Sequence, residues 1–137
     1  MSKARFEASD FGAGLLAPGR YECEVVSAQL RRSRQGHHMV EVVLTLVDAD
    51  AGSTQVRDYF VLEGVSPRGL AVARSRLVEL YRACEVEPQP GDEIAPEQLV
   101  DARIEVKLDH EERDGQWRLR AVGYRAVPRR LTDDPPF

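Results

Sequence analysis

A single helical segment interrupts a chain whose other regular segments have the pattern of β-strands, and this order limits the possible folds more than any other feature. Apolar and polar residues alternate in five runs, as they do in half-buried strands. These runs are residues 20–30, 38–47, 55–62, 103–109 and 117–127. Ser66 as an N-cap and Pro67 at the first helical position indicate a helix, and apolar residues recur at helical spacing as far as Cys84. The expected order is three strands, one helix and two strands.

The alternation also predicts which side chains are buried. On the first three strands the expected inward positions are Tyr21, Cys23, Val25, Val40, Val42, Leu44, Leu46, Val56, Phe60 and Leu62. We expect Arg57, Tyr59 and Val61 on the opposite face of the third strand, because successive side chains of a strand point to opposite sides. A basic loop at residues 31–36 separates the first two strands, and residues 112–115 form a hairpin turn between the last two.

Five strands with one helix between the third and fourth is the order of the OB-fold, a small Greek-key barrel that commonly binds oligonucleotides. Other α+β arrangements contain the same elements. We expect a mainly β protein, a five-stranded OB-fold barrel, in one domain because 137 residues suffice for one. The domain is expected to span residues 20–128, between a flexible N-terminal segment (residues 1–19) and a mobile C-terminal tip (residues 129–137).

Charge is unevenly distributed along the chain, although the net charge is only −4. Residues 85–112 contain ten acidic and two basic residues, whereas residues 113–130 contain six arginines and one acid. A second basic patch, without acids, covers residues 29–38. Recognition of nucleic acid needs a basic face rather than a basic protein, so net acidity does not exclude it. The 17 arginines against 2 lysines suit phosphate binding, but a GC-rich genome gives the same excess.

Neither a membrane protein nor a disulfide-rich secreted protein is expected. No apolar run approaches the ~20 residues of a membrane span, and the N-terminus leads into no signal-peptide core. Cys23 and Cys84 are too few for a disulfide framework or a zinc cluster. We therefore expect a cytoplasmic protein with reduced thiols and no membrane contact.

Enzymatic chemistry finds little support in the sequence. His37 and His38 are adjacent and so cannot share one strand face, and His110 stands alone. No HExxH or CxxC motif, glycine-rich phosphate loop or nucleophile signature is present. We expect no catalytic residue, no metal and no cofactor. An active site that only the fold assembles is the alternative that the sequence leaves open.

The residues favour binding to a single-stranded nucleic acid, which proteins hold with basic side chains along the phosphates and aromatic faces against the bases. The candidate DNA-binding residues are Arg31, Arg32, Arg34, His37, His38, Arg57, Tyr59, Trp117, Arg118, Arg120 and Tyr124. Tyr59 is expected on the basic face of the third strand, and Arg118 and Arg120 are expected to share a strand face with Tyr124. The alternatives are a solvated strand face for the arginines and core packing for Trp117.

The last residues, 133–137, read Asp-Asp-Pro-Pro-Phe. They resemble the C-terminal tip of bacterial single-stranded-DNA-binding proteins, which ends Asp-Asp-Asp-Ile-Pro-Phe and recruits replication and repair enzymes. In such a segment the ring fills an apolar pocket while the carboxylates face a basic rim. The resemblance implies that protein partners are bound by Asp133, Asp134, Pro135, Pro136 and Phe137. The isoleucine of the family tip is replaced by Pro135, and a chance ending is the alternative.

Several short motifs follow one another in the body of the chain with a characteristic spacing. They are Leu16-Ala-Pro-Gly-Arg-Tyr21, Ser33-Arg-Gln-Gly36, Asp58-Tyr59-Phe60, Leu99-Val100 and Ile104-Glu-Val106. Over residues 6–128 this spacing resembles a family of phage-encoded single-stranded-DNA-binding proteins. In that family an asparagine follows the loop glycine, where this chain has His37. The resemblance implies a small OB-type protein of a kind that is often encoded beside recombination genes.

The residues and both resemblances lead to one predicted function. It is sequence-independent binding and protection of single-stranded DNA in DNA replication, recombination and repair, with replication or recombination proteins recruited through the C-terminal tip. The first alternative is an OB-fold protein-interaction module that does not bind DNA and whose basic face meets an acidic partner. The second is an enzyme with a scattered active site. The sequence does not determine the oligomeric state, and a homo-oligomer is one of the alternatives.

Overall fold

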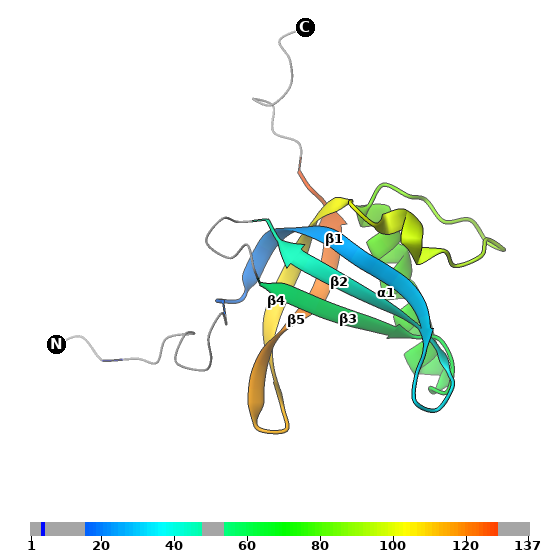
Figure 1. The fold of residues 1–137 in the computed structure, drawn as a ribbon, viewed down its shortest axis with the longest axis horizontal. Coiled ribbons are helices and arrows are strands. Elements are labelled where there is room, and N and C mark those ends of the chain that lie inside the picture. Colours follow the sequence, from blue (N-terminus) through cyan, green and yellow to red (C-terminus); the bar gives the residue numbers. More distant parts are fainter. Residues whose placement is uncertain (1–3, 5–15, 48–53, 129–137) are drawn as a thin grey trace, which may run out of the picture.

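A five-stranded antiparallel sheet with one α-helix against it forms the body of the protein (Figure 1), in a computed structural model that describes residues 4, 16–47 and 54–128. The strands are β1 (Gly19–Arg32), β2 (His38–Leu46), β3 (Gln55–Val61), β4 (Arg103–Arg113) and β5 (Gln116–Ala126). Helix α1 (Pro67–Ala83) follows β3 in the chain, and a 3₁₀ turn, η3 (Pro96–Leu99), precedes β4. The prediction of a mainly β protein with five strands and a helix after the third is confirmed.

Strand β1 is shared by the two halves of the sheet, whose strand order is β3-β2-β1-β4-β5. The first residues of β1 pair with β4, and the residues from Cys23 to Arg32 pair with β2. Val26 is an extra residue between the pairs formed by Val25 and Ser27, a β-bulge of the kind that bends and twists a strand. The bend lets one strand of 14 residues belong to both halves.

Backbone pairing does not close the described part of the sheet into the expected barrel, because the strand order ends at β3 and β5. Side chains bridge these two edges instead. Asp58 on β3 accepts a hydrogen bond from the Tyr124 hydroxyl on β5 and lies 2.5 Å from Nη2 of Arg76 on α1. The same Arg76 nitrogen donates to the Ala121 carbonyl at 3.3 Å, and the Phe60 and Tyr124 rings lie 6.3 Å apart. The polar side chains thus occupy the space between the edges.

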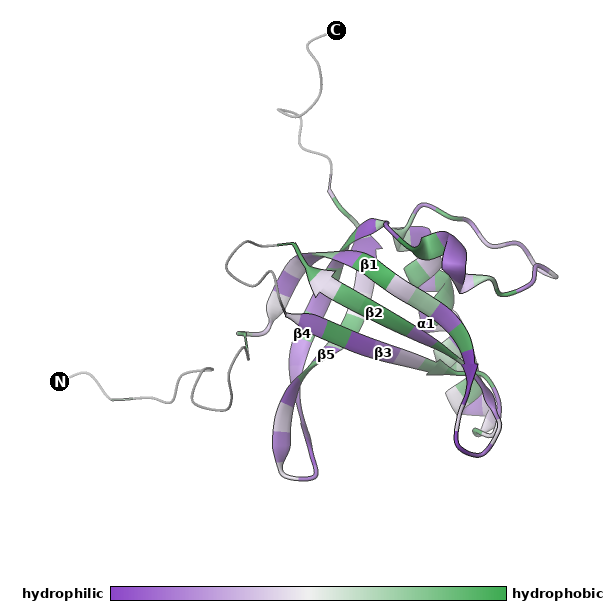
Figure 2. Ribbon diagram, viewed as in Figure 1, coloured by the Kyte–Doolittle hydropathy of each residue, from purple (hydrophilic) through white to green (hydrophobic). Residues whose placement is uncertain are grey.

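One hydrophobic core fills the space enclosed by the sheet and α1. Its buried members on the strands are Cys23, Val25, Ala28, Val40, Val42, Leu44, Leu46, Val56, Phe60, Ile104, Val106, Leu108, Ala121 and Tyr124. Figure 2 shows that β2 is mostly hydrophobic, whereas the ends of both hairpins are hydrophilic. On α1 the buried face includes Leu77, Leu80 and Tyr81. Ser66 caps this helix by accepting a hydrogen bond from the Gly69 N–H at 3.1 Å, as the sequence predicts.

The loop between β1 and β2 is shorter than the basic loop expected at residues 31–36. Arg31 and Arg32 belong to β1, where they pair with the first residues of β2. Pairing extends this far because the loop closes tightly, with the Ser33 N–H donating to the His37 carbonyl at 2.8 Å. The two arginines are therefore held on a strand rather than in a loop.

At the N-terminal side, the body includes residues that precede the expected domain start at residue 20. The Tyr21 hydroxyl donates to the Ala17 carbonyl at 2.7 Å, and Nε2 of His110 lies 2.6 Å from the Leu16 carbonyl. The rest of the expected N-terminal segment, residues 1–3 and 5–15, and the tip at residues 129–137 lie outside the described residues. No helix in the described ranges has the length and apolarity needed to cross a membrane.

Candidate nucleic-acid interface

The outer face of β1, β2 and β3 gathers four charged or aromatic side chains, which we call the platform: Arg31, Glu41, Arg57 and Tyr59. Glu41, on β2, the middle one of these three strands, is paired with Tyr59 on β3. Arg31 on β1 and Arg57 on β3 occupy diagonal positions on either side, where long side chains still reach a cross-strand neighbour. Three strands therefore bring together residues that are 28 positions apart at most in the chain.

Glu41 is the centre of the platform and is only 5% exposed. Nη1 of Arg31 donates to Oε1 of Glu41 at 2.8 Å, and Nη1 of Arg57 donates to Oε2 at 3.4 Å. The hydrogen bond from Arg31 is the main cause that lowers the pKa of Glu41, with smaller contributions from the Tyr59 hydroxyl and Arg57, against the opposing effect of burial. Glu41 therefore stays ionised at neutral pH and binds both arginines.

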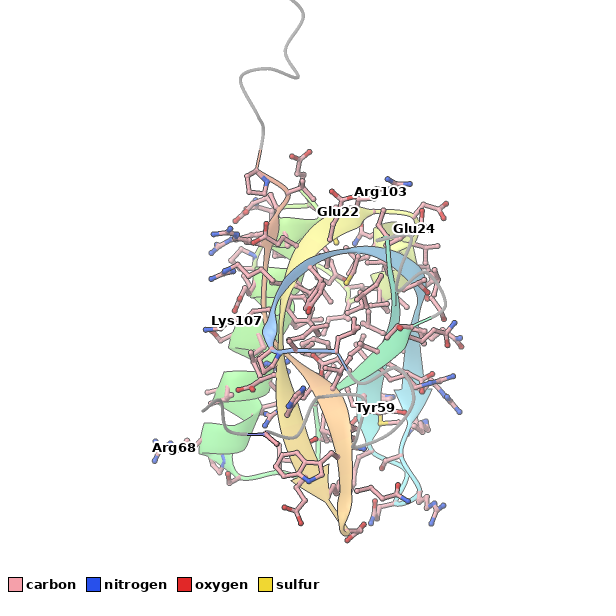
Figure 3. All side chains as sticks on the ribbon, turned by 90° about the vertical axis from the view of Figure 1, so that its left-hand side faces the viewer. Glu22, Glu24, Tyr59, Arg68, Arg103 and Lys107 are labelled. Carbon is pink, nitrogen blue, oxygen red and sulfur yellow. The ribbon has the colours of Figure 1, made fainter. Side chains whose placement is uncertain are left out.

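Tyr59 presents the exposed aromatic surface of the platform. Tyr59 is 45% exposed, whereas its strand neighbours Asp58 and Phe60 point to the inner side of the sheet. In Figure 3 Tyr59 lies in the lower half of the molecule, away from the charged residues Glu22, Glu24 and Arg103 near the top. Its ring is half-exposed on the outer face of β3, the face on which the sequence places it.

The β1–β2 loop and the strand residues that flank it add cations beside the platform, whereas the two histidines there contact the connection between β3 and α1. Nη1 of Arg32 donates to the Gly36 carbonyl at 2.9 Å, and Arg34 is exposed in the loop. Nδ1 of His38 lies 2.5 Å from Oε1 of Glu63, in the connection between β3 and α1. His37 packs over that connection too, because a Cβ on the following Gly64 would lie 2.5 Å from its ring. The two histidines therefore anchor the loop.

Hairpin β4–β5 carries a second aromatic group near arginines. It projects from the same end of the molecule as the β1–β2 loop, the lower end in Figures 1 and 3. Trp117 is 43% exposed, and the His110 ring meets it edge-on at 6.4 Å. Arg118 and Arg120 lie 3.0 and 3.7 Å from the Glu111 carboxylate. The hairpin thus places an exposed tryptophan and two arginines on the other half of the sheet.

Tyr124 is a correction to the sequence prediction, which put it on one strand face with Arg118 and Arg120. The β4–β5 pairing shifts between Lys107 and Leu108, so Val122 is an extra residue on β5. An extra residue reverses the faces of the residues beyond it. Tyr124 therefore lies in the core, 5% exposed, and its ring is not available for stacking.

A second Arg–Glu–Arg cluster lies on the other half of the sheet. Glu105 on β4 is 3.7 Å from Nη1 of Arg20 on β1 and 2.6 Å from Nη2 of Arg125 on β5. Neither this glutamate nor Glu41 is among the site residues predicted from the sequence. For Glu41 a signal existed: a single acid within the apolar run of residues 38–47 implies a charged partner, since buried carboxylates are rarely left unpaired.

The described residues also include two thiols and a carboxylate that lines a cavity. No group of three or more histidines, cysteines or carboxylates there could hold a metal ion. Burial raises the pKa of Cys23 to about 12 and that of Cys84 to about 11, so both thiols stay protonated. A cavity of about 390 Å³ between α1 and β5 contains Glu79, but its carboxylate is bound to the backbone N–H of Tyr124 at 2.8 Å.

No protein-family model matches this chain, and no curated protein matches it.

Proposed function

We propose that the chain is an OB-fold protein that binds single-stranded DNA with little sequence preference and protects it during replication or recombination. An OB-fold is a five-stranded, partly open Greek-key barrel. Three features support this assignment: the strand order, the bent β1 shared by both halves, and the helix between β3 and β4. The side-chain bridge from Asp58 to Tyr124, which holds the edges β3 and β5 together, is consistent with it.

The observation that carries the proposal is the exposed Tyr59 ring beside Arg31 and Arg57 on the outer face of the sheet. OB-folds bind oligonucleotides on the face of their second and third strands and with the loops that join strands 1–2 and 4–5. The platform occupies that face, and the two hairpin ends carry the cations of the β1–β2 loop and the pair Arg118 and Arg120.

Binding of this kind needs no chemistry and reads no base edge. An arginine has five N–H donors, and each platform arginine uses Nη1 for Glu41 while its side chain stays more than half exposed. The remaining donors are free to bind phosphate. A base stacked on Tyr59 contributes about 1–3 kcal/mol whatever its identity, which accounts for the lack of sequence preference.

Partner recruitment is part of the proposal and rests on the sequence resemblance alone. Asp133, Asp134, Pro135, Pro136 and Phe137 would bind replication or recombination proteins in the cytoplasm, with the ring in an apolar pocket and the acids on a basic rim.

A titration with a fluorescently labelled oligo-dT at low salt tests the proposal. We expect anisotropy to rise and the emission of Trp117, the single tryptophan, to be quenched. Tyr59→Ala should weaken binding by roughly 5- to 100-fold, because it removes the stacking face. The matched variant Tyr59→Phe keeps the ring and should bind within about twofold of wild type. A wild-type protein that does not bind at low salt contradicts the proposal.

One observation favours the protein-interaction alternative. Both platform arginines are already engaged by Glu41, so this cluster carries only one net positive charge. A face of that kind suits an acidic protein segment as well as a polyphosphate. The same titration separates the two functions, because an interaction module leaves oligo-dT unbound even when salt does not screen the charges.

A further inference from the structure

We propose that Glu41 is an internal competitor of the DNA phosphates: it holds Arg31 and Arg57 in the free protein and limits the affinity of the platform for DNA. The inference rests on the proposed function, since it concerns the same face. The platform then contains residues that strengthen DNA binding and one, Glu41, that weakens it. Removal of the Glu41 charge should therefore raise the affinity for DNA.

The burial of Glu41 points to a role beyond solubility. Among the described residues it is the only buried polar or charged side chain, and its neighbours on both sides in β2 are valines. A buried carboxylate is costly unless its charge is paired, and here two arginines from two neighbouring strands pair it. The arginines themselves are more than half exposed, so they face the side from which a ligand arrives.

In this arrangement Glu41 and the DNA phosphates compete for the same two arginines. The 2.8 Å bond from Arg31 and the 3.4 Å contact of Arg57 satisfy both oxygens of Glu41 with one nitrogen from each arginine. A phosphate that binds the outward donors comes within range of the Glu41 charge, which repels it, and the two anions share the same guanidinium groups. Glu41 therefore opposes each phosphate contact that Arg31 and Arg57 make.

The cluster around Glu105 supplies a matched control within the same chain. Glu105 also lies between two arginines from neighbouring strands, Arg20 and Arg125. Glu105→Gln removes the same charge and releases the same number of arginines, on the half of the sheet that carries no platform. It changes the net charge as Glu41→Gln does.

The test is an oligo-dT titration of wild type, Glu41→Gln and Glu105→Gln over a range of salt concentrations. We expect Glu41→Gln to bind about tenfold more tightly at low salt, with a slope of log affinity against log salt steeper by about 0.7, the value of one added phosphate contact. Glu105→Gln should stay within about twofold of wild type. Equal gains in both variants, or unchanged or weaker binding by folded Glu41→Gln, overturn the inference.

The outcomes also separate the inference from the proposed function. If wild type binds and Glu41→Gln binds no better, only the inference is wrong. If neither protein binds, the proposed function is wrong and the inference falls with it. Glu41→Gln should fold, because water solvates the released half-exposed arginines. Should its melting curve show otherwise, Glu41→Met, which keeps the volume without the charge, takes its place in the same titration.

Discussion

The outer faces of the two halves of the sheet are built on the same charge pattern and differ in what surrounds it. On β1, β2 and β3, Glu41 lies between Arg31 and Arg57. On β1, β4 and β5, Glu105 lies between Arg20 and Arg125. Each cluster takes its glutamate from the middle strand and one arginine from each neighbouring strand. The same type of Arg–Glu–Arg cluster therefore occurs on both halves of the sheet, and it does not define a binding site by itself.

The surroundings distinguish the two faces. Beside Glu41 lie the exposed ring of Tyr59 and two more arginines, Arg32 at the end of β1 and Arg34 in the following loop. Beside Glu105 lies a further acid, Glu22, which is its cross-strand partner on β1. Single-stranded DNA needs both a stacking surface and an excess of positive charge, and the first face alone among the described residues combines an exposed tyrosine with an acid-free loop. The comparison predicts which substitutions weaken binding.

Removing one platform arginine together with the two arginines next to the platform should have the largest effect. Neutralising Arg31, Arg32 and Arg34 together removes up to three phosphate contacts, each worth about −0.7 in the slope of log affinity against log salt. We expect affinity for oligo-dT to fall roughly 100-fold at low salt and the slope to become shallower by up to about 2. Salt titrations by anisotropy measure both quantities.

The matched control neutralises three arginines on the other face. These are Arg20, Arg103 and Arg125. Affinity and slope should change little. An equal loss of affinity would mean that DNA binds wherever positive charge is exposed and not at the platform. That result would contradict the proposed difference between the two faces.

The Trp117→Ala variant tests whether the DNA path extends to the hairpin of the other half. Loss of one stacked base should weaken binding of oligo-dT roughly tenfold. Because more than half of this residue is buried against the hairpin, a melting curve must accompany the titration. Unchanged affinity in a folded variant would confine the site to β1, β2 and β3.

Acid should remove the stabilising contribution of the Glu41 cluster. The folded-state pKa of Glu41 lies below the ordinary value of 4.5, mainly because of the Arg31 hydrogen bond. The contribution is fully present above pH 4.5 and is lost as the pH falls through the lowered pKa. Urea unfolding of wild type and Glu41→Gln should show a stability difference at neutral pH that shrinks in acid. A difference that does not depend on pH would contradict this account of Glu41.

The smallest effect on the folded body is expected from removal of residues 133–137. The melting temperature should stay the same, and DNA affinity should stay the same or rise modestly at low salt, because Asp133 and Asp134 no longer compete with phosphate. Pull-down of replication or recombination proteins should be lost, and Phe137→Ala should lose it without altering DNA affinity. A truncated protein that melts far earlier would contradict the interpretation of the tip.

Local signals predicted the order of elements and the ends of α1. The Ser66 cap, Pro67 and the apolar spacing up to Cys84 act within a few residues, and the helix runs from Pro67 to Ala83. The open sheet could not be predicted this way. The bridge between its edges joins Asp58 to Tyr124, which lie 66 residues apart, and no local pattern records such a contact.

The site was predicted in part for the same reason. Arg57 and Tyr59 share a face, as strict alternation requires. Tyr124 was assigned to the wrong face because the bulge at Val122 is invisible in the alternation. Glu41 was overlooked because its role depends on partners 10 and 16 residues away on two other strands.

Mapping the DNA contact by NMR tests the central claim most directly. Oligo-dT is added to the ¹⁵N-labelled protein, and the shifts of the backbone amides on the two faces are compared. The account predicts that the largest shifts occur at Arg31, Glu41, Arg57 and Tyr59 and in the β1–β2 loop, while Arg20, Glu105 and Arg125 change little. Shifts centred on Glu105, or spread equally over both faces, would contradict it.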